Sequence, residues 1–166
     1  PIGGDRTFQP VHPGRIVNDE ALSPILLGRC LRIGYSGRGS HLEVRHGDAN
    51  GADDIATASL LLHSSISTFG GCYLTYVRST NSVYLLRDTD QTWLPVVVGS
   101  SSVVENANCG LSGAGLTVTA NGNTLSLVLP LTFKASFAGA KNLYVLVSDA
   151  TGLSAGWTSL GTWTAP

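Results

Sequence analysis

The sequence predicts an all-β protein, a sandwich of two antiparallel sheets formed by one domain. Short apolar segments alternate with polar residues and are separated by turn residues, a pattern typical of strands. Charged residues make up 13% of the 166 residues, which is low for a soluble domain, whereas glycines number 20. No segment combines a 3.6-residue apolar period with helix caps. These three observations favour strands and turns over helices.

The amino-terminal segment differs in composition from the remainder of the chain. Residues 1–35 are rich in proline and glycine, and we expect them to form an extended arm or an edge strand. Residues 36–166 are expected to form the sandwich domain, which is long enough to bury its own core.

The first strands of the expected sandwich are read from alternation. Leu42, Val44 and His46 share one face of a strand because they alternate with polar neighbours. Residues 54–64 are apolar on both faces, which predicts a central strand covered on both sides. Residues 72–78 and 82–87 flank a short polar turn and therefore predict a hairpin.

The carboxyl-terminal half predicts further strands. Residues 93–98 form one, and Pro95 indicates an edge position or a bulge. Residues 116–120 and 123–133 flank Asn121-Gly122, the strongest short hairpin signal, while Pro130 indicates an edge or a kink. Residues 143–147 are continuously apolar, as in a sandwich core. Residues 156–164 read as the closing strand, with Trp157 and Trp163 on the same side. The total of about eight or nine strands predicts an immunoglobulin-like β-sandwich.

Three cysteines bear on the compartment. Cys72 precedes a strand-like segment and Cys109 follows a polar stretch, so each can lie where two strands end side by side. We predict a Cys72–Cys109 disulfide, which would imply an oxidising compartment. Cys30 is left over as a small apolar residue. The competing interpretation is three buried thiols in a cytosolic protein.

Charge and hydropathy limit the expected partners. The net charge is −1, so no overall field attracts nucleic acid. No apolar run approaches the ~20 residues of a membrane helix. We therefore expect neither nucleic-acid binding nor a membrane span.

Five motifs in the second part of the chain carry a family resemblance. They are DANGADDIATASLLLHSS (48–65), GCYLTYVRSTNSVYLLRD (71–88), NANCGLSGAG (106–115), NTLSLVLPLTFKASFAGAKNLYVLVSDATGLSAGW (123–157) and LGTWT (160–164). From residue 36 onward the chain resembles an uncharacterised immunoglobulin-like β-sandwich domain that recurs in large secreted and surface proteins of soil bacteria. The resemblance implies an extracellular location and supports the Cys72–Cys109 pairing, since both cysteines stand in these motifs. It implies no activity.

The sharpest candidate for a metal site lies at residues 48–54. Asp48, Asn50, Asp53 and Asp54 surround Gly51 and offer oxygen ligands that Ca²⁺ would accept. The spacing is not that of an EF-hand, and an Asx-type turn between strands is the alternative. Apart from this calcium candidate, the sequence predicts no cofactor.

The sequence contains no recognisable catalytic set, so we expect no enzymatic activity. His41 and His46 point to opposite faces of a strand and are poor joint metal ligands, and surface or capped positions are favoured for the four histidines. Serines are plentiful, but there is no G-x-S-x-G nucleophile motif.

Aromatic residues provide the remaining candidate for binding. Most of the tryptophans and tyrosines are expected to fill the core, as a sandwich of this size requires. Trp157 is the exception, because Gly156 and a polar loop precede it, and an exposed tryptophan suits sugar stacking.

Taken together, these features predict a non-catalytic extracellular structural or adhesive module. A self-assembling surface-filament subunit that uses its amino-terminal arm for β-strand addition fits them, with a homo-oligomer or neighbouring domains of a surface assembly as partners. Members of the resembled family usually form part of longer polypeptides, so a chain of this length favours such a subunit or a segment of a larger protein. The alternative function is a carbohydrate-binding module with glycans as partners.

Overall fold

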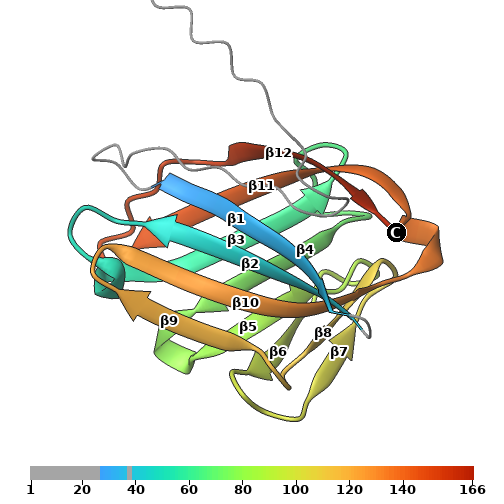
Figure 1. Cartoon of the computed structure of the whole chain (residues 1–166), viewed down its shortest axis with the longest axis horizontal. Coiled ribbons are helices and arrows are strands. Elements are labelled where there is room, and N and C mark those ends of the chain that lie inside the picture. Colours follow the sequence, from blue (N-terminus) through green and yellow to red (C-terminus); the bar gives the residue numbers. More distant parts are fainter. Residues whose placement is uncertain (1–26, 37–38) are drawn as a thin grey trace, which may run out of the picture.

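The computed structural model describes residues 27–36 and 39–166, and these form a two-layered β-sandwich (Figure 1). Twelve strands lie in two six-stranded antiparallel sheets, and the only helical segments are three short 3₁₀ turns within the described part. The predicted all-β fold and its immunoglobulin-like sandwich class are confirmed. Three strands exceed the predicted nine: β1 (Leu27–Ser36), which lies in the segment expected as an arm or edge strand, and β7 (Val103–Glu105) and β8 (Cys109–Ser112), which are too short for their alternation to be recognised.

The first sheet, sheet A, is built from residues 27–47 and from residues 103–133. Its spatial order is β1-β2-β10-β8-β7, and β9 pairs with β10 beside β8. These strands are β1 (Leu27–Ser36), β2 (Gly39–Gly47), β10 (Thr124–Phe133), β8 (Cys109–Ser112), β7 (Val103–Glu105) and β9 (Thr117–Asn121).

The second sheet, sheet B, has the spatial order β12-β11-β3-β4-β5-β6. The strands are β12 (Thr158–Ala165), β11 (Gly139–Asp149), β3 (Ile55–His63), β4 (Cys72–Val77), β5 (Ser82–Leu86) and β6 (Trp93–Val97). The segment predicted as a central strand is β3, which pairs with β11 and β4, and Pro95 lies on the edge strand β6 as expected.

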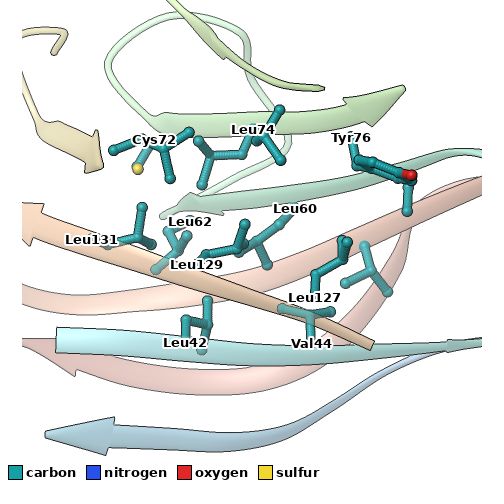
Figure 2. Packing of buried hydrophobic residues seen from close by; sticks show 14 of the residues in the cluster. Leu42, Val44, Leu60, Leu62, Cys72, Leu74, Tyr76, Leu127, Leu129 and Leu131 are labelled. Carbon is teal, nitrogen blue, oxygen red and sulfur yellow. The ribbon is translucent and has the colours of Figure 1, made fainter. Parts of the chain in front are cut away.

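The core lies between the two sheets and consists almost entirely of aliphatic side chains (Figure 2). Alternate residues of each strand point inward because successive side chains of a strand lie on opposite faces. On β4, for example, Leu74 and Tyr76 are buried whereas Tyr73 and Thr75 are partly exposed. Figure 2 shows the two layers of inward side chains, among them Leu42, Val44, Leu60, Leu62, Leu127, Leu129 and Leu131.

The β9–β10 hairpin forms at the predicted place, but its two turn residues are Gly122 and Asn123, one residue later than the predicted Asn121-Gly122. Asn121 pairs with Thr124, and Gly122 has a φ of 55°. A two-residue turn requires such a positive φ, which glycine adopts without steric cost.

Pro130 does not lie on a sheet edge, so that part of the prediction was wrong. The strand β10 is paired on both sides, but its neighbour changes from β9, which ends its pairing at Val128, to β8, which begins at Leu131. Pro130 falls between these two partners and pairs only with His41 of β2. Because no strand pairs with Pro130 on this side of β10, the N–H group that proline lacks leaves no strand pairing incomplete.

The closing strand also departs from the prediction at one residue. Leu143 pairs with Gly161 and Tyr144 pairs with Ser159, so Leu160 is an extra residue in a β-bulge. A bulge inverts the alternation of faces on its two sides. Trp163 is consequently buried in the core, whereas Trp157 contacts Tyr73 on the other face of sheet B, and the two tryptophans do not share a side.

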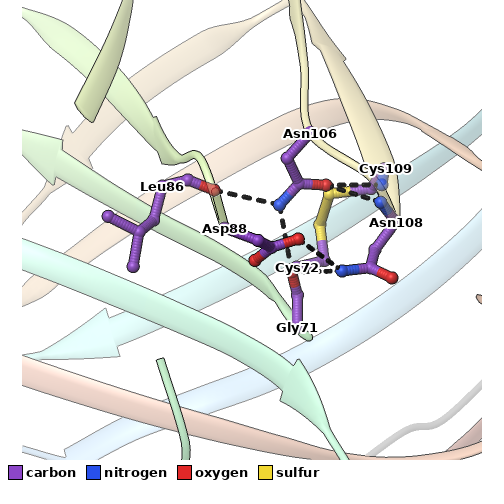
Figure 3. The surroundings of a disulfide bond; sticks show 7 residues. All are labelled: Gly71, Cys72, Leu86, Asp88, Asn106, Asn108 and Cys109. Carbon is purple, nitrogen blue, oxygen red and sulfur yellow. Dashed lines mark hydrogen bonds between the residues drawn. A yellow bond between two sulfur atoms is a disulfide. The ribbon is translucent and has the colours of Figure 1, made fainter. Parts of the chain in front are cut away.

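The predicted disulfide is present and joins the two sheets. Cys72 begins β4 of sheet B and Cys109 begins β8 of sheet A. Asn106 lies buried beside the bond, where its Nδ2 donates to the carbonyls of Gly71 and Leu86 at 3.0 and 2.9 Å (Figure 3). Its Oδ1 accepts from the backbone N–H groups of Asn108 and Cys109 at 2.8 Å. This amide therefore satisfies four main-chain groups where the sheets are joined.

The amino-terminal arm lies largely outside the described residues. β1 covers residues 27–36, and it is an edge strand of sheet A that pairs with β2. The predicted boundary between residues 35 and 36 falls at the end of this strand. The side chain of Cys30 is not part of the description.

Candidate functional site

The outward face of sheet B carries a group of three aromatic side chains, Tyr73, Trp93 and Trp157, which we call the outer aromatic cluster. The ring centroid of Tyr73 lies 5.0 Å from that of Trp93, with an interplanar angle of 77°. The same ring lies 5.4 Å from Trp157 at an angle of 67°. Both contacts are edge-to-face arrangements, which aromatic rings favour. Tyr73 is therefore the central member, with a tryptophan on each side.

Two members of the cluster stand on regular strands, whereas Trp157 lies in the segment that precedes β12. Tyr73 faces outward from β4 because its neighbours Cys72 and Leu74 point into the core. Trp93 begins the edge strand β6 and pairs with Leu86 of β5. Side chains carried by paired strands are held more firmly than side chains on a loop.

Two leucines lie beneath this part of the outward face. Leu61 pairs with Tyr73 across β3 and β4, and Leu86 pairs with Trp93. Leu61 is fully buried and Leu86 is 3% exposed, although neither belongs to the core cluster between the sheets. These leucines form an apolar floor, and the aromatic rings complete a second, smaller apolar layer outside the sandwich.

The exposure of the cluster distinguishes it from the core. Trp93 is 39% exposed, and Tyr73 and Trp157 are partly exposed. Trp163, by contrast, is 5% exposed and packs against Phe133 with ring centroids 4.8 Å apart. Of the three tryptophans, two are thus available to a partner.

Hydroxyl and amide groups lie beside the aromatic row on the same face. Ser59 and Thr75 form a hydrogen bond of 3.0 Å between their hydroxyl oxygens, and Tyr84 pairs with Thr75 in the neighbouring strand. On the other flank, Tyr144 pairs with Leu61, and its hydroxyl receives a 3.0 Å hydrogen bond from Asn142 Nδ2. The face therefore combines flat apolar rings with neutral hydrogen-bonding groups, and no charged residue belongs to these two polar groups.

An acidic group lies near the end of the same sheet. Asp88 follows β5, its Oδ2 accepts from Asn108 at 2.9 Å, and its Oδ1 is buried with no partner among the described residues (Figure 3). Burial raises the pKa of Asp88, while the Gly70 N–H and the nearby His63 act in the opposite direction. This partly buried carboxylate is held by the loops around the disulfide.

The residues predicted to bind calcium are engaged in other contacts. Asp48 Oδ1 accepts from the Asn50 N–H at 2.8 Å, and Asn50 Nδ2 contacts Asp54 at 3.5 Å. Asp53 lies 3.4 Å from the guanidinium of Arg78, which also donates to the carbonyls of residues 52 and 55. These contacts are those of an Asx-type turn, with the positively charged guanidinium of Arg78 beside it. They give the calcium prediction no support.

This loop instead holds the tip of the β9–β10 hairpin. The backbone N–H of Asp48 donates to the carbonyl of Asn123, and that of Ala52 donates to the carbonyl of Gly122, both at 2.9 Å. Asp48 Oδ2 is buried without a partner among the described residues. In the part of the chain that the structure describes, no group of three or more His, Cys, Asp or Glu residues is arranged to hold a metal ion.

His46 corrects the expectation that the histidines lie on the surface or are capped. Its ring is fully buried on the inward face of β2, and neither nitrogen has a hydrogen-bond partner among the described residues. Burial lowers the pKa of His46 to about 3, so the ring is neutral at physiological pH. His63 lies at the surface, where its Nδ1 contacts the backbone of Ser65. His12 lies outside the described residues.

Comparison with known proteins adds no relative: no family model, no curated protein and no solved structure matches this chain. Within the described residues, no helix has the length and apolar character needed to cross a membrane.

Sequence reasoning identified Trp157 as a binding candidate but missed its companions, Tyr73 and Trp93. The alternation of β4 places Tyr73 opposite to Leu74, and this signal was available in the sequence. The approach of Trp93 and Trp157 to the same tyrosine depends on strand order, which alternation does not reveal.

Proposed function

We propose that this protein is a non-catalytic extracellular adhesive module that binds carbohydrate through the outer aromatic cluster. The observation that carries the proposal is the contact of Tyr73 with both Trp93 and Trp157 on the outward face of sheet B. Tryptophan and tyrosine offer a large apolar surface together with a polar group, and the apolar face of a sugar ring stacks on such rings. The disulfide is compatible with an extracellular location.

The polar surroundings favour a neutral polyhydroxylated ligand over an ionic one. Hydroxyl groups of Thr75 and Tyr84 lie in the adjacent row, where the buried Ser59 bonds to Thr75, and Asn142 and Tyr144 lie on the other flank. Such groups donate and accept hydrogen bonds without imposing a charge on the ligand. The buried leucines, the outer aromatic cluster and the neutral polar groups on both sides of it together fit a sugar, which has apolar ring faces and many hydroxyl groups.

A glycan array of the full chain, followed by calorimetric titration with any glycan that binds, tests this proposal. Trp93→Ala and Trp157→Ala are expected to weaken binding at least tenfold each. Val103→Ala, which removes an exposed apolar side chain from sheet A, serves as the matched control and should bind as the parent does. Absence of glycan binding, or equal binding by all variants, would refute the proposal.

The non-catalytic part of the proposal has its own test. Any glycan that binds is incubated with the protein for long periods, and the products are separated by chromatography. We expect the ligand to be recovered unchanged. Cleavage that the protein accelerates would show an enzyme instead.

A second function, self-assembly as a surface-filament subunit, is favoured by the strand β9. Among the described strands, β9 pairs with β10 alone, so one of its edges offers unpaired backbone groups. β-strand addition uses edges of this kind. In the form predicted from the sequence, the amino-terminal arm of a neighbouring copy supplies the added strand. Deleting residues 1–17 should then abolish the assemblies that electron microscopy shows for the parent, and unchanged assemblies would exclude the arm.

A further inference from the structure

Among the strands that the structure describes, the edge of β9 is less protected than the other sheet edges. Proteins protect edge strands with proline, charged residues, bulges or short length. β6 contains Pro95, β7 has only three residues, and β12 and β1 each contain a register shift. β9 runs over five residues with an unbroken register, and it contains neither proline nor charge.

The surroundings of β9 are also free of charge. No residue from 106 to 133 is charged, so the strand, its turn and its partner β10 are all neutral. The side chains of Thr117, Thr119, Ala120 and Asn121 are exposed, and Val118 is partly buried against the core. Two copies of this edge can therefore approach each other without like-charge repulsion.

The hairpin geometry shows which backbone groups face the free edge. Asn121 and Thr124 flank a two-residue turn and form a hydrogen-bonded pair, so alternate residues of β9 direct their backbone groups to β10. By the same alternation, Val118 and Ala120 direct their N–H and C=O groups away from β10. These two residues define the register of any added strand.

We propose that β9 pairs with β9 of a second copy of this chain, antiparallel and about a two-fold axis through Thr119. In this register Val118 of each copy pairs with Ala120 of the other, which forms about four main-chain hydrogen bonds. Thr119 then faces Thr119 of the second copy in the non-hydrogen-bonded pair, where cross-strand threonines interact favourably. The contact is isologous and joins sheet A of the two copies into one continuous sheet. It does not depend on glycan binding, because the outer aromatic cluster lies on sheet B.

Cysteine cross-linking of the full chain tests the register. Thr119→Cys places two thiols opposite each other at the axis, within the Cα separation of about 4.4–6.8 Å that a disulfide spans. We expect this variant to form a disulfide-linked dimer under mild oxidation. Thr117→Cys, equally exposed on the same strand, is the matched control and faces Asn121 of the second copy, so it should not cross-link beyond the parent. Equal cross-linking of the two variants, or none for Thr119→Cys, overturns the proposal.

Charge exchange at the same position tests the contact without a covalent bond. Sedimentation velocity should show a concentration-dependent dimer for the parent, monomers for Thr119→Lys and for Thr119→Glu alone, and a dimer for their equimolar mixture. Because Thr119 is exposed, circular dichroism should show that both variants keep the fold. A parent that is monomeric at all concentrations, or a dimer that Thr119→Lys does not weaken, overturns the proposal. The arm of a neighbouring copy and a second β9 would occupy the same free edge, so the two assemblies are alternatives. The dimer should persist after deletion of residues 1–17, whereas assembly through the arm should not.

Discussion

Two groups of three aromatic side chains in this molecule lie in opposite environments. Phe133, Phe137 and Trp163 pack together at one end of the core, with ring centroids of 5.9 Å and 4.8 Å from Phe133 to the other two. The outer aromatic cluster lies on the outward face of sheet B, where Trp93 is 39% exposed. The inner group is surrounded by protein and contributes mainly to stability. The outer cluster retains surface that a partner can cover. Substitutions in the inner group should therefore lower stability, whereas substitutions in the outer aromatic cluster should lower binding.

Trp163→Ala should have the largest effect on stability. Truncation of a buried aromatic side chain costs about 3–5 kcal/mol, because apolar contacts are lost and a cavity remains. Urea unfolding of the parent and the variant measures the change. A loss below about 1 kcal/mol would show that the inner group does not support the core.

Asn106→Ala should follow, with a loss of about 2–4 kcal/mol in the free energy of unfolding. The change leaves the N–H groups of Asn108 and Cys109 and the carbonyl of Leu86 without their buried partner, and each unsatisfied buried group costs about 1–3 kcal/mol. Asn108→Ala is the matched control, since its amide donates only to Gly71 and Asp88. Equal losses for the two variants would contradict the role assigned to Asn106.

Lowering the pH should decrease the free energy of unfolding, because the buried His46 is neutral in the folded protein. The folded state keeps this ring neutral with a pKa of about 3, whereas the unfolded chain protonates it near pH 6.5, so stability is complete above pH 6.5 and falls as the pH is lowered toward 3. The slope of about 1.4 kcal/mol per pH unit predicts a loss of about 3 kcal/mol near pH 4.5.

His46→Leu isolates this contribution. The lowered pKa values of Asp90 and Asp149 decrease stability only when the pH falls to the usual pKa range of aspartate or below it. The raised pKa of Asp88 increases stability as the pH falls, which is opposite to the effect of His46. The variant should therefore lose most of the pH dependence between pH 6.5 and 4.5 in urea unfolding, whereas His63→Leu should keep it. An unchanged slope in His46→Leu would contradict the burial of a neutral ring.

The smallest effect on stability is expected at the outer aromatic cluster. Trp93→Ala and Trp157→Ala should each change the free energy of unfolding by less than about 1 kcal/mol, because the exposed Trp93 and the partly exposed Trp157 lose fewer contacts than a core residue does. A variant with both residues changed to phenylalanine keeps Trp163 alone, and its fluorescence should resist iodide quenching. Strong quenching of that variant would show that Trp163 is not shielded.

Much of the sandwich was predictable because its signals are local. Strict alternation located β2 and β4, and Asn121-Gly122 located the β9–β10 turn. The Cys72–Cys109 bond also followed from the sequence. Alternation and the turn signal depend on neighbouring residues alone, so strand order is not needed to read them, whereas the cysteine pairing was predicted from the ends of strands and supported by the family resemblance.

The features that were missed depend on the three-dimensional arrangement. Pro130 reads as an edge residue, but it falls where β10 exchanges one neighbour for another. His46 was expected at the surface because it is polar, although alternation had already placed it on the same face as Leu42 and Val44, which is the face buried in the core. Trp157 was identified as a binding candidate, whereas its contact with Tyr73 required knowledge of which strands lie side by side.

The bulge at Leu160 links the two aromatic groups through a single residue. Without it, Trp157 and Trp163 would project from the same side of β12, as simple alternation requires. Adding or removing one residue elsewhere between Trp157 and Trp163, with the bulge retained, would place both side chains on the same face, so that either Trp163 leaves the core or Trp157 leaves the outer face. Changes of length between Trp157 and Trp163 are therefore restricted more than the position of β12 on the sheet edge suggests. Such a change would displace either the buried Trp163 from the core or Trp157 from the outer aromatic cluster.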